Sequence, residues 1–400
     1  MQEQGLPCGV CGAGERAITY FKSLTAAGFA ATAISYGPAR MGFGLFVPEF
    51  RTAFGMSPAT VGIVSSLGFA GFFLGLLVAQ WLLNRKGPKV PVLAGLAAAA
   101  LGLMTVTAAP NVAVLAGGVF LAAASAGFAW TPFNDAVHRK IRDTDRPTAL
   151  SEISTGTTVG VVVAASIALA MSLSGFHWRI CWAIFAALAA LALAGNWAAL
   201  RHVEKAPDDA PPGGWRDLLR REAVPLFALA FVFGVTSAIY ISFATDRYAG
   251  SGLPGLPQGA AGAAVFISYG LFGLTGLATG RVEARLGLPW LARGVMLAGA
   301  ASLALAGALP GWVGLVASAG LQGVHVMVTS AVIAFWSERL FPALPSLSFT
   351  AVLLATAAGS ILGPAIAGLV SGSLGPGPMF LGAAILPLAT VLAGLKPVAS

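Results

Sequence analysis

The sequence predicts an all-α integral membrane protein in which twelve transmembrane helices form two pseudo-symmetric six-helix bundles. Three observations lead to this prediction. First, 57% of the 400 residues are hydrophobic and only 10% are charged, whereas soluble domains carry about 25% charged residues. Second, apolar runs long enough to span a bilayer recur along the whole chain. Third, features of the first half recur in the second half at a nearly constant offset.

The apolar runs define the predicted spans. A helix needs about 20 apolar residues to cross the hydrocarbon core of a membrane. Twelve runs approach or exceed this length, at roughly 24–47, 58–82, 90–109, 112–135, 149–172, 178–200, 223–246, 259–280, 288–309, 311–336, 346–371 and 377–395. The domain organisation that follows is an N-terminal tail, a first bundle, a polar linker, a second bundle and a C-terminal tail, at 1–22, 23–200, 201–222, 223–395 and 396–400.

The linker and the N-terminal tail are the two longest polar stretches. Proline, glycine and mixed charge are typical of a connection between domains, and the sequence WRDLLRR at 215–221 predicts a short amphipathic helix at the membrane surface. The tail carries Cys8 and Cys11 in a lone C-x-x-C. Because a metal site needs about four ligands, we expect an unstructured tail there and no metal.

The basic residues predict the orientation. With the N-terminus placed inside, 18 of the 23 Lys and Arg residues fall on the inner side, and Arg51, Arg179 and Arg247 fall on the outer side. Cytoplasmic loops are enriched in Lys and Arg, so we expect both termini in the cytoplasm and the protein in the cell (inner) membrane. The same distribution accounts for the net charge of +8 without a nucleic-acid partner. The expected partners are the bilayer and a small-molecule solute, and the expected state is a monomer.

A basic turn between the second and third runs, in GLLVAQWLLNRKGPKVPVL, carries a recognisable motif. It resembles the loop between helices 2 and 3 of the major facilitator superfamily, whose pattern is Gly, any, Leu, Ala, Asp, Arg, any, Gly and two bases. Leu82, Arg85, Gly87 and Lys89 match this pattern, and Asn84 stands at the Asp position. The sequence GFHWRICWAIF at 175–185 similarly resembles the start of helix 6 in that superfamily.

The two halves repeat each other. In GRVEARLG, Arg285 and Gly287 stand 200 positions after Arg85 and Gly87. Further pairs share offsets of 200 or 203: Arg40 and Tyr240, Gly62 and Gly262, Asp135 and Glu338, Gly156 and Gly359, and Gly160 and Gly363. Parallel repeats related by an axis along the membrane normal are the architecture that the resemblance implies.

The resemblance, which covers 24–395, implies a secondary active transporter that works by alternating access. In this architecture helices 1, 4, 7 and 10 line a central cavity. The sequence contains no G-x-x-x-x-G-K-[ST], H-E-x-x-H or nucleophile elbow. We therefore expect no enzyme activity, no catalytic residues, no metal and no cofactor.

Arg40 is the main candidate for binding the solute. An arginine within an apolar span is costly unless it faces water or a partner. Our hypothesis is that its guanidinium holds an anionic group, with two hydrogen bonds if that group is a carboxylate. The alternative is that Arg40 reaches the outer surface or pairs with Glu49. Tyr36, one turn earlier, shares its face, and Tyr240 is expected to face it across the cavity, so we expect an anionic or amphipathic solute.

Three further side chains are candidates for the cavity wall. Trp130 and Asn134 lie four residues apart and so share one face of the fourth span, although Trp130 has packing as an alternative role. His325, in the tenth span, is a candidate for binding solute and for carrying a coupled proton. A hydrogen bond from His325 to a neighbouring helix is the alternative. Proton symport and uncoupled exchange both remain open.

Gating and structural roles are predicted for residues at the inner helix ends and for glycines in the spans. Acidic side chains at the inner ends are expected to pair with nearby arginines and hold that side closed, while a Gly-x-x-x-Gly-Pro run suits close, bendable packing. The residues concerned are Arg85, Gly87, Lys89, Asp135, Arg285, Gly287, Glu338, Gly359, Gly363 and Pro364.

Two other functions compete with transport of an anion in either direction. An exporter of hydrophobic cations or drugs would carry an acid deep in the cavity, and the sequence places none there. A non-transporting receptor on the same scaffold would carry an added soluble domain or a catalytic cluster, and neither is present.

Overall fold

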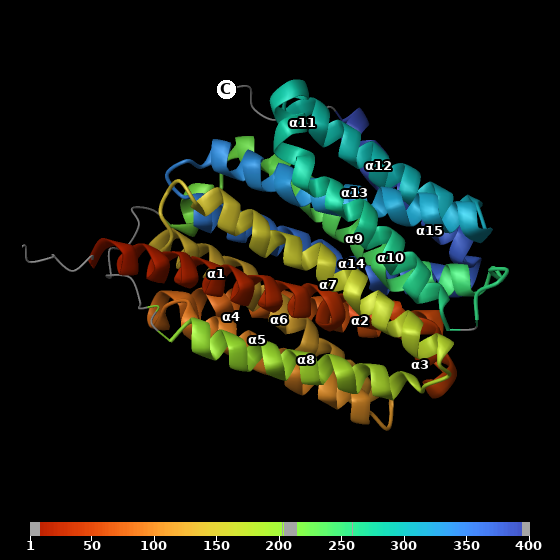
Figure 1. The fold of residues 1–400 in the computed structure, drawn as a ribbon. Helices are drawn as coiled ribbons and strands as arrows, with labels where there is room; N and C mark the ends of the chain where they lie inside the picture. Colours follow the sequence, from red (N-terminus) through yellow and green to blue (C-terminus); the bar gives the residue numbers. More distant parts are fainter. Residues whose placement is uncertain (1–8, 202, 204–213, 258, 394–400) are drawn as a thin grey trace, which may run out of the picture.

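A computed structural model of the chain describes residues 9–201, 203, 214–257 and 259–393. The described part is helical with short connections (Figure 1). In chain order the elements are α1 (Gly9–Tyr36), a π-helical turn η1 (Gly37–Met41), α2 (Gly42–Leu45), α3 (Val47–Phe54), α4 (Pro58–Lys86), α5 (Lys89–Ala108), α6 (Val112–Lys140), α7 (Arg146–Leu173), α8 (Trp178–Ala199), the 3₁₀ turns η2 (Trp215–Leu218) and η3 (Arg221–Ala223), α9 (Val224–Ala249), α10 (Ala261–Gly273), the 3₁₀ turn η4 (Leu274–Ala278), α11 (Thr279–Leu286), α12 (Leu288–Ala308), α13 (Gly311–Leu340), α14 (Pro345–Leu374) and α15 (Pro376–Leu392).

The all-α membrane architecture is confirmed. Within the described residues, 10 helical segments are long and apolar enough to cross a membrane. Helix α15 is a shorter apolar helix of 17 residues. The first predicted span, 24–47, is divided among α1, η1, α2 and the start of α3. The eighth continues from α10 through η4 into α11, beyond the predicted end at residue 280.

The helix ends follow from local sequence. The Ser57 side chain accepts a hydrogen bond from the Thr60 backbone N–H and so caps the start of α4. At the other end of α4, Gly87 has φ 72°, and Gly287 ends α11 with φ 76°. Positive φ favours glycine. The two basic turns therefore share one backbone conformation, as their matching sequence positions predict.

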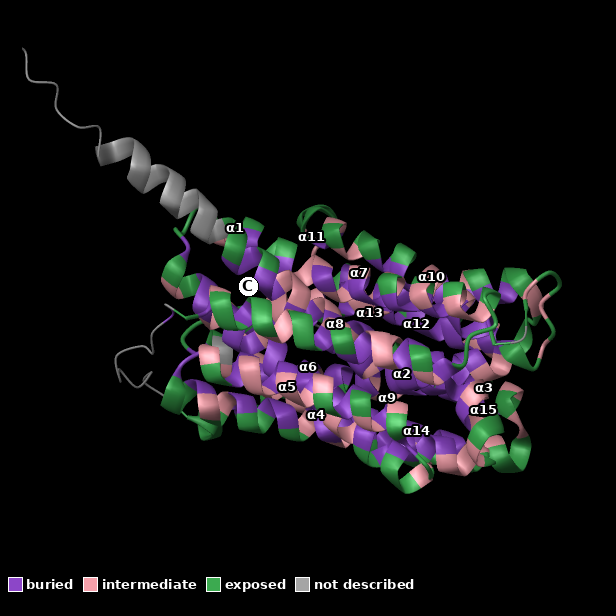
Figure 2. Cartoon of the chain, turned by 60° about the horizontal axis from the view of Figure 1, so that its bottom comes forward, coloured by how far each residue is buried: buried purple, intermediate pink, exposed green. Residues whose placement is uncertain are grey.

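The helices fall into two groups in the view of Figure 1, with α4, α5, α6 and α8 on one side and α11, α12, α13 and α15 on the other. We call the end of the molecule that carries α3 and the α9–α10 connection (250–260) the α3 end, and the opposite end, which carries η2 and η3, the linker end. The N-terminal half of the chain packs against the C-terminal half through two helix pairs. Helix α4 contacts α14, and helix α7 contacts α10. Buried residues fill the interior, and exposed ones cover the ends and outer faces (Figure 2).

Glycines permit the closest helix contacts. A Cβ on Gly156 of α7 would lie 2.4 Å from the Phe29 carbonyl oxygen of α1. In the second half, a Cβ on Gly359 of α14 would lie 2.1 Å from the Phe231 oxygen of α9, and one on Gly363 would lie 2.6 Å from the Val235 oxygen. The repeat partners Gly156 and Gly359 thus make equivalent helix contacts in the two halves.

Gly359→Ala tests this packing. The added methyl group would overlap the Phe231 carbonyl, and overpacking of this kind costs about 1–3 kcal/mol. We expect the thermal unfolding midpoint of the detergent-solubilised protein, followed by tryptophan fluorescence, to fall by several degrees. The matched control is Gly382→Ala on α15, where a Cβ would meet no atom within 4 Å. Equal midpoints for the two variants would contradict the close-packing interpretation.

Two local expectations, on the N-terminal tail and on 215–221, are wrong, and one connection contains a helix that was not predicted. The predicted tail is helical from Gly9, since α1 extends outward from the first span; Cys8 and the rest of 1–8 lie outside the described residues. The connection 48–57 contains the helix α3, which begins with proline at its second position and ends at Gly55 with φ 63°. The segment 215–221 forms two short 3₁₀ turns instead of one amphipathic helix. Residues 202, 204–213 and 394–400, and with them half of the predicted linker and the whole C-terminal tail, lie outside the described part.

Candidate functional site

The site is built where the first span departs from α-helical geometry. Pro38 has no backbone N–H and its ring crowds the preceding turn, and the chain forms the π-helical turn η1 around it. Single π turns inside α-helices often occur at functional positions. Arg40 is the only basic residue of η1, and its neighbours Gly37, Pro38, Ala39 and Met41 are buried.

Aromatic rings surround the Arg40 guanidinium. Its central carbon lies 4.2 Å from the Phe72 ring centroid, 5.4 Å from that of Tyr36 and 5.6 Å from that of Phe69. Cation–π contacts of this kind favour a positive charge in an otherwise apolar setting. The Arg40 Nε is buried without a hydrogen-bond partner, and no ion pair joins Arg40 to Glu49 or to another residue that the structure describes. The guanidinium therefore retains unused hydrogen-bond donors.

A small pocket opens beside Arg40. It is lined by Arg40, Phe43, Gly44, Ser65, Gly68, Phe69, Val119, Ala123, Ile241 and Ser242, which come from η1, α2, α4, α6 and α9. The space left between these side chains holds about one water molecule. A solute of organic size would need the surrounding helices to move apart. The structure thus represents a conformation in which this site is contracted.

Tyr240 and His325 lie away from this pocket. Tyr240 is 1% exposed, its hydroxyl accepts a hydrogen bond of 3.0 Å from Ser318 of α13, and its ring packs against Phe380. Tyr240 does not line the pocket across from Arg40, because its buried hydroxyl finds a partner within its own half. His325 is fully buried, and its Nδ1 lies 2.7 Å from the Val295 carbonyl oxygen of α12. This is the contact with a neighbouring helix that the sequence left as the alternative.

Tyr36 is the candidate side chain that the structure brings together with Arg40. Trp130 is half-buried and packs against the hydrophobic core, whereas Asn134 has a buried Oδ1 without a hydrogen-bond partner. Neither lines the pocket beside Arg40. The structure therefore divides the candidates into a compact Arg40–Tyr36 group and separate residues on α6, α9 and α13.

Ion pairs at the linker end stay within one half. Asp135 pairs with Arg139 one turn along α6 at 2.6 Å, and Arg339 of α13 pairs with Glu283 of α11 at 2.6 Å. Arg85 stacks on the Trp81 ring. A 3.4 Å hydrogen bond from Thr350 of α14 to Gln80 of α4 joins the two halves at this end. The expected charged latch between the halves is therefore absent at this end of the described structure.

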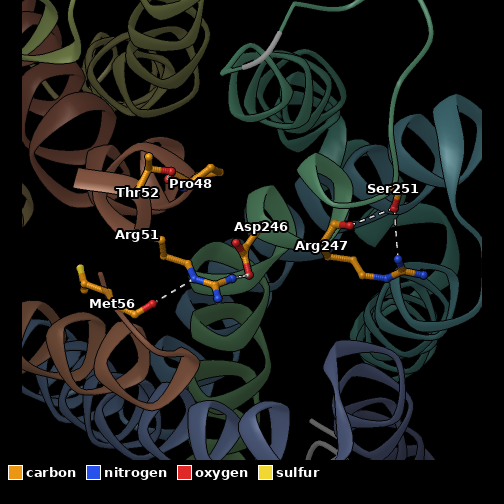
Figure 3. A network of polar contacts seen from close by, with 7 residues as sticks. All are labelled: Pro48, Arg51, Thr52, Met56, Asp246, Arg247 and Ser251. Carbon is orange, nitrogen blue, oxygen red and sulfur yellow. Dashed lines mark hydrogen bonds and ion pairs between the residues drawn. The ribbon is translucent and has the colours of Figure 1, made fainter. Parts of the chain in front are cut away.

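The α3 end carries an ion pair between the halves. Arg51 of α3 contacts the Asp246 carboxylate of α9 at 2.5 Å, and its Nε donates to the Met56 carbonyl oxygen at 3.2 Å (Figure 3). Helices also touch here through glycine. A Cβ on Gly62 would lie 2.2 Å from the Pro364 oxygen, and one on Gly262 would lie 2.1 Å from the Leu45 oxygen. The two halves are therefore in close contact at the α3 end.

With this geometry in view, the comparisons with known proteins identify the family. The model of the Major Facilitator Superfamily matches residues 28–342. This match covers well over half of the chain, so the chain belongs to the Major Facilitator Superfamily and is a transporter rather than an enzyme.

Two solved structures share the fold. One is a point mutant of the nucleoside transporter NupG, with a TM-score of 0.74 and 18% identity over 95% of this chain and 100% of that one. The other is NupG itself, with a TM-score of 0.70 and 19% identity over 94% of this chain and 98% of that one. A comparison with curated proteins found no match.

Several pocket residues were missed by the sequence reasoning. Ser65 and Phe69 of α4 lie four residues apart on one helical face, and Ile241 and Ser242 follow Tyr240 on α9. The spacing of Ser65, Gly68 and Phe69 was a usable signal, because i, i+3 and i+4 positions share a face. It did not stand out, because the resemblance assigns the cavity wall to helices 1, 4, 7 and 10, and α4 is the second predicted span.

Charge reversal tests the contact at the α3 end. Arg51→Asp alone would place two carboxylates side by side, and we expect it to lower the rate of solute uptake several-fold by disfavouring the closed α3 end. Combining it with Asp246→Arg restores opposite charges and should recover most of the rate. The pair is partly solvated, so we expect a coupling of about 1 kcal/mol. Additive effects in the double variant would contradict a direct contact.

Proposed function

We propose that this chain is a secondary active transporter in which two six-helix halves, 23–200 and 223–395, move against each other around the Arg40 site. In this proposal twelve helices span the membrane, with α1, η1, α2 and the start of α3 together forming the first and α15 the last. The matched conformations of Gly87 and Gly287 and the equivalent contacts of Gly156 and Gly359 support the repeat. The positive-inside rule supports a cytoplasmic linker end and an external α3 end.

We propose a small organic anion as the solute. The observation that carries this proposal is the unpaired Arg40 guanidinium beside a pocket that contains no acidic side chain. A carboxylate or phosphate would use the free donors of Arg40 in a pair of parallel hydrogen bonds. The rings of Tyr36, Phe69 and Phe72 around the guanidinium favour a solute that combines the anionic group with a flat apolar part, that is, an amphipathic anion.

Transport assays can distinguish two alternative solute classes, hydrophobic cations and nucleosides, from the proposed anion. An exporter of hydrophobic cations needs an acid in the pocket, and the residues that line the pocket beside Arg40 supply none. Nucleosides deserve a test because the structures with the same fold are named as nucleoside transporters. For coupling, proton symport and uncoupled exchange are both retained. His325 lies apart from the pocket, and its Nδ1 contacts the Val295 carbonyl oxygen instead of a group of the Arg40 site.

Uptake into proteoliposomes tests the substrate class. Purified protein is reconstituted and offered radiolabelled aromatic carboxylates, aliphatic carboxylates, nucleosides and aromatic cations of similar size, with protein-free liposomes as the blank. We expect uptake or counterflow of aromatic carboxylates above the blank and none of the cations. Uptake restricted to cations, or to nucleosides without a charged group, would contradict the proposed anion.

A further inference from the structure

Glu49 occupies a buried junction between the two halves. It lies in the first turn of α3, beyond the first predicted span, and is half-buried. A Cβ on Gly259, in the α9–α10 connection of the other half, would lie 2.9 Å from the Glu49 Oε1 and 3.5 Å from the Ser172 Oγ of α7. The Glu49 Oε2 is buried without a hydrogen-bond partner. One oxygen of the carboxyl group is thus buried at this junction between the halves.

The arginines of the elements near Glu49 interact with other groups and not with Glu49. On α3 itself Arg51 pairs with Asp246, on α8 Arg179 donates to the carbonyls of Thr107 and Ala109, and on α9 Arg247 donates to those of Ala306 and Gly307. The other titratable groups on these elements are Cys181 of α8, His177 at the N-cap of α8, and Tyr240 and Tyr248 of α9. None of the described bases forms an ion pair with Glu49. A charge in this position would be partly buried without a counter-charge, which is unfavourable.

We propose that Glu49 is a proton-binding site that is occupied when the α3 end is closed and empties when it opens. The proton comes from, and returns to, the medium at the α3 end, because the carboxyl group lies at that surface. The solute site at Arg40 is thereby linked to external acidity without the movement of a proton through the protein. This inference rests on the proposed alternating-access function.

The direction of the effect follows from burial. Burial raises the pKa of Glu49 from its usual value of 4.5 to about 7 in the closed conformation. In an open conformation that hydrates the carboxyl group, its pKa returns toward the usual value. Closure is therefore favoured most below about pH 4.5, weakens as the pH rises toward 7, and stays weakened above that. The closed-to-open ratio should change by up to the order of a hundredfold across this range.

The neighbouring Asp246 would act in the opposite direction. Protonation of Asp246 would break its ion pair with Arg51, and so acid acting there would open the α3 end. The sign of the pH response therefore distinguishes Glu49 from Asp246.

Distance measurements by pulsed electron paramagnetic resonance test the proposal without any solute. Nitroxide labels are placed at Thr52→Cys of α3 and Ser373→Cys of α14, both exposed at the α3 end. The full-length protein carries Cys8→Ser, Cys11→Ser and Cys181→Ala and is reconstituted in lipid. We expect a short distance at pH 5 and a growing long-distance population by pH 8. Glu49→Gln, which mimics the protonated carboxyl group, should keep the short distance at both pH values.

Three matched variants complete the experiment. Glu49→Asp should retain a pH response, since it keeps a carboxyl group. His177→Gln removes the exposed imidazole of α8 and should leave the response unchanged. Asp246→Asn should lengthen the distance at both pH values but keep the direction of the response. A pH response in Glu49→Gln equal to that of the parent protein, or no response in the parent, would overturn the proposal. Anion uptake that depends on Arg40 would survive that failure, so the two proposals fail separately.

Discussion

Uptake of an anionic solute is expected to fall by at least about 30-fold when Arg40 is replaced by alanine. The substitution removes the guanidinium that borders the pocket and leaves the anion of the solute without a charged partner. Losing one partner of a desolvated, hydrogen-bonded charge pair costs about 2–5 kcal/mol, and 1.4 kcal/mol corresponds to tenfold. The measurement is the initial rate of uptake into proteoliposomes at a solute concentration below half-saturation.

Two variants show whether the loss is specific. Arg40→Lys keeps the charge but not the planar pair of donors, and we expect an intermediate rate. Arg293→Ala removes another arginine from an apolar segment, one that is half-buried, stacks on Trp290 and lies outside the pocket, and should leave the rate near that of the parent protein. Because Arg40 packs against three rings, the thermal midpoint of Arg40→Ala is measured alongside. A folded Arg40→Ala variant with unchanged uptake would exclude Arg40 as the anion-binding residue.

The second large effect is expected from the glycines that bring the halves together. A methyl group at Gly62 would lie 2.2 Å from the Pro364 oxygen, and one at Gly262 would lie 2.1 Å from the Leu45 oxygen. Both contacts join the two halves at the α3 end, so the added methyl group opposes closure rather than folding of either half. Overpacking costs about 1–3 kcal/mol, which would lower the closed-to-open ratio by roughly 5- to 150-fold.

Gly62→Ala and Gly262→Ala should therefore lower the uptake rate and lengthen the Thr52–Ser373 label distance. The matched control is Gly117→Ala on α6, where a Cβ would meet no atom within 4 Å. The expected thermal midpoints differ little from that of the parent protein, in contrast to Gly359→Ala within the second half. Normal uptake by both variants would show that the contacts seen at the α3 end are not part of the transport cycle.

The fold class could be predicted because its signals are local or compositional. Long apolar runs indicate membrane spans whatever they pack against, and the offset of 200 between Gly87 and Gly287 is visible in the letters alone. The turn η1 in the first span has an equally local cause, because Pro38 limits the backbone on its own. By contrast, the helix at Val47–Phe54 was missed, since a polar segment between two spans has the composition of a loop.

The candidate site was harder to predict. A polar residue within a span can face the central site, or it can form a hydrogen bond to another helix of its own half. Arg40 is charged, and a charged side chain within a span is energetically costly unless it faces water or a partner. This made Arg40 a strong candidate. Tyr240 and His325 are neutral or can become so, and a hydrogen bond inside one half satisfies them equally well; the structure places them against Ser318 and Val295. Which environment applies depends on helix rotation and tilt, which the spacing of residues along one helix does not specify.

The ion pairs between the halves were also not predictable, because they depend on how the helices are arranged in the bundle. Acidic and basic residues at the linker end suggested a latch between the halves, but Asp135 has Arg139 one turn away on its own helix and pairs there. The pair that does join the halves, Arg51 with Asp246, links positions 195 residues apart. Such a contact follows from the assembled bundle and has no counterpart in the local sequence pattern.

Equilibrium binding of a matched pair of solutes tests the central claim most directly. The transported carboxylate and its uncharged amide are titrated into the detergent-solubilised parent protein and the Arg40→Ala variant. The account predicts that the substitution weakens binding of the carboxylate by at least about 30-fold and that of the amide by less than about threefold. Equal weakening for both solutes, or none for the carboxylate, would contradict a guanidinium that recognises the anion.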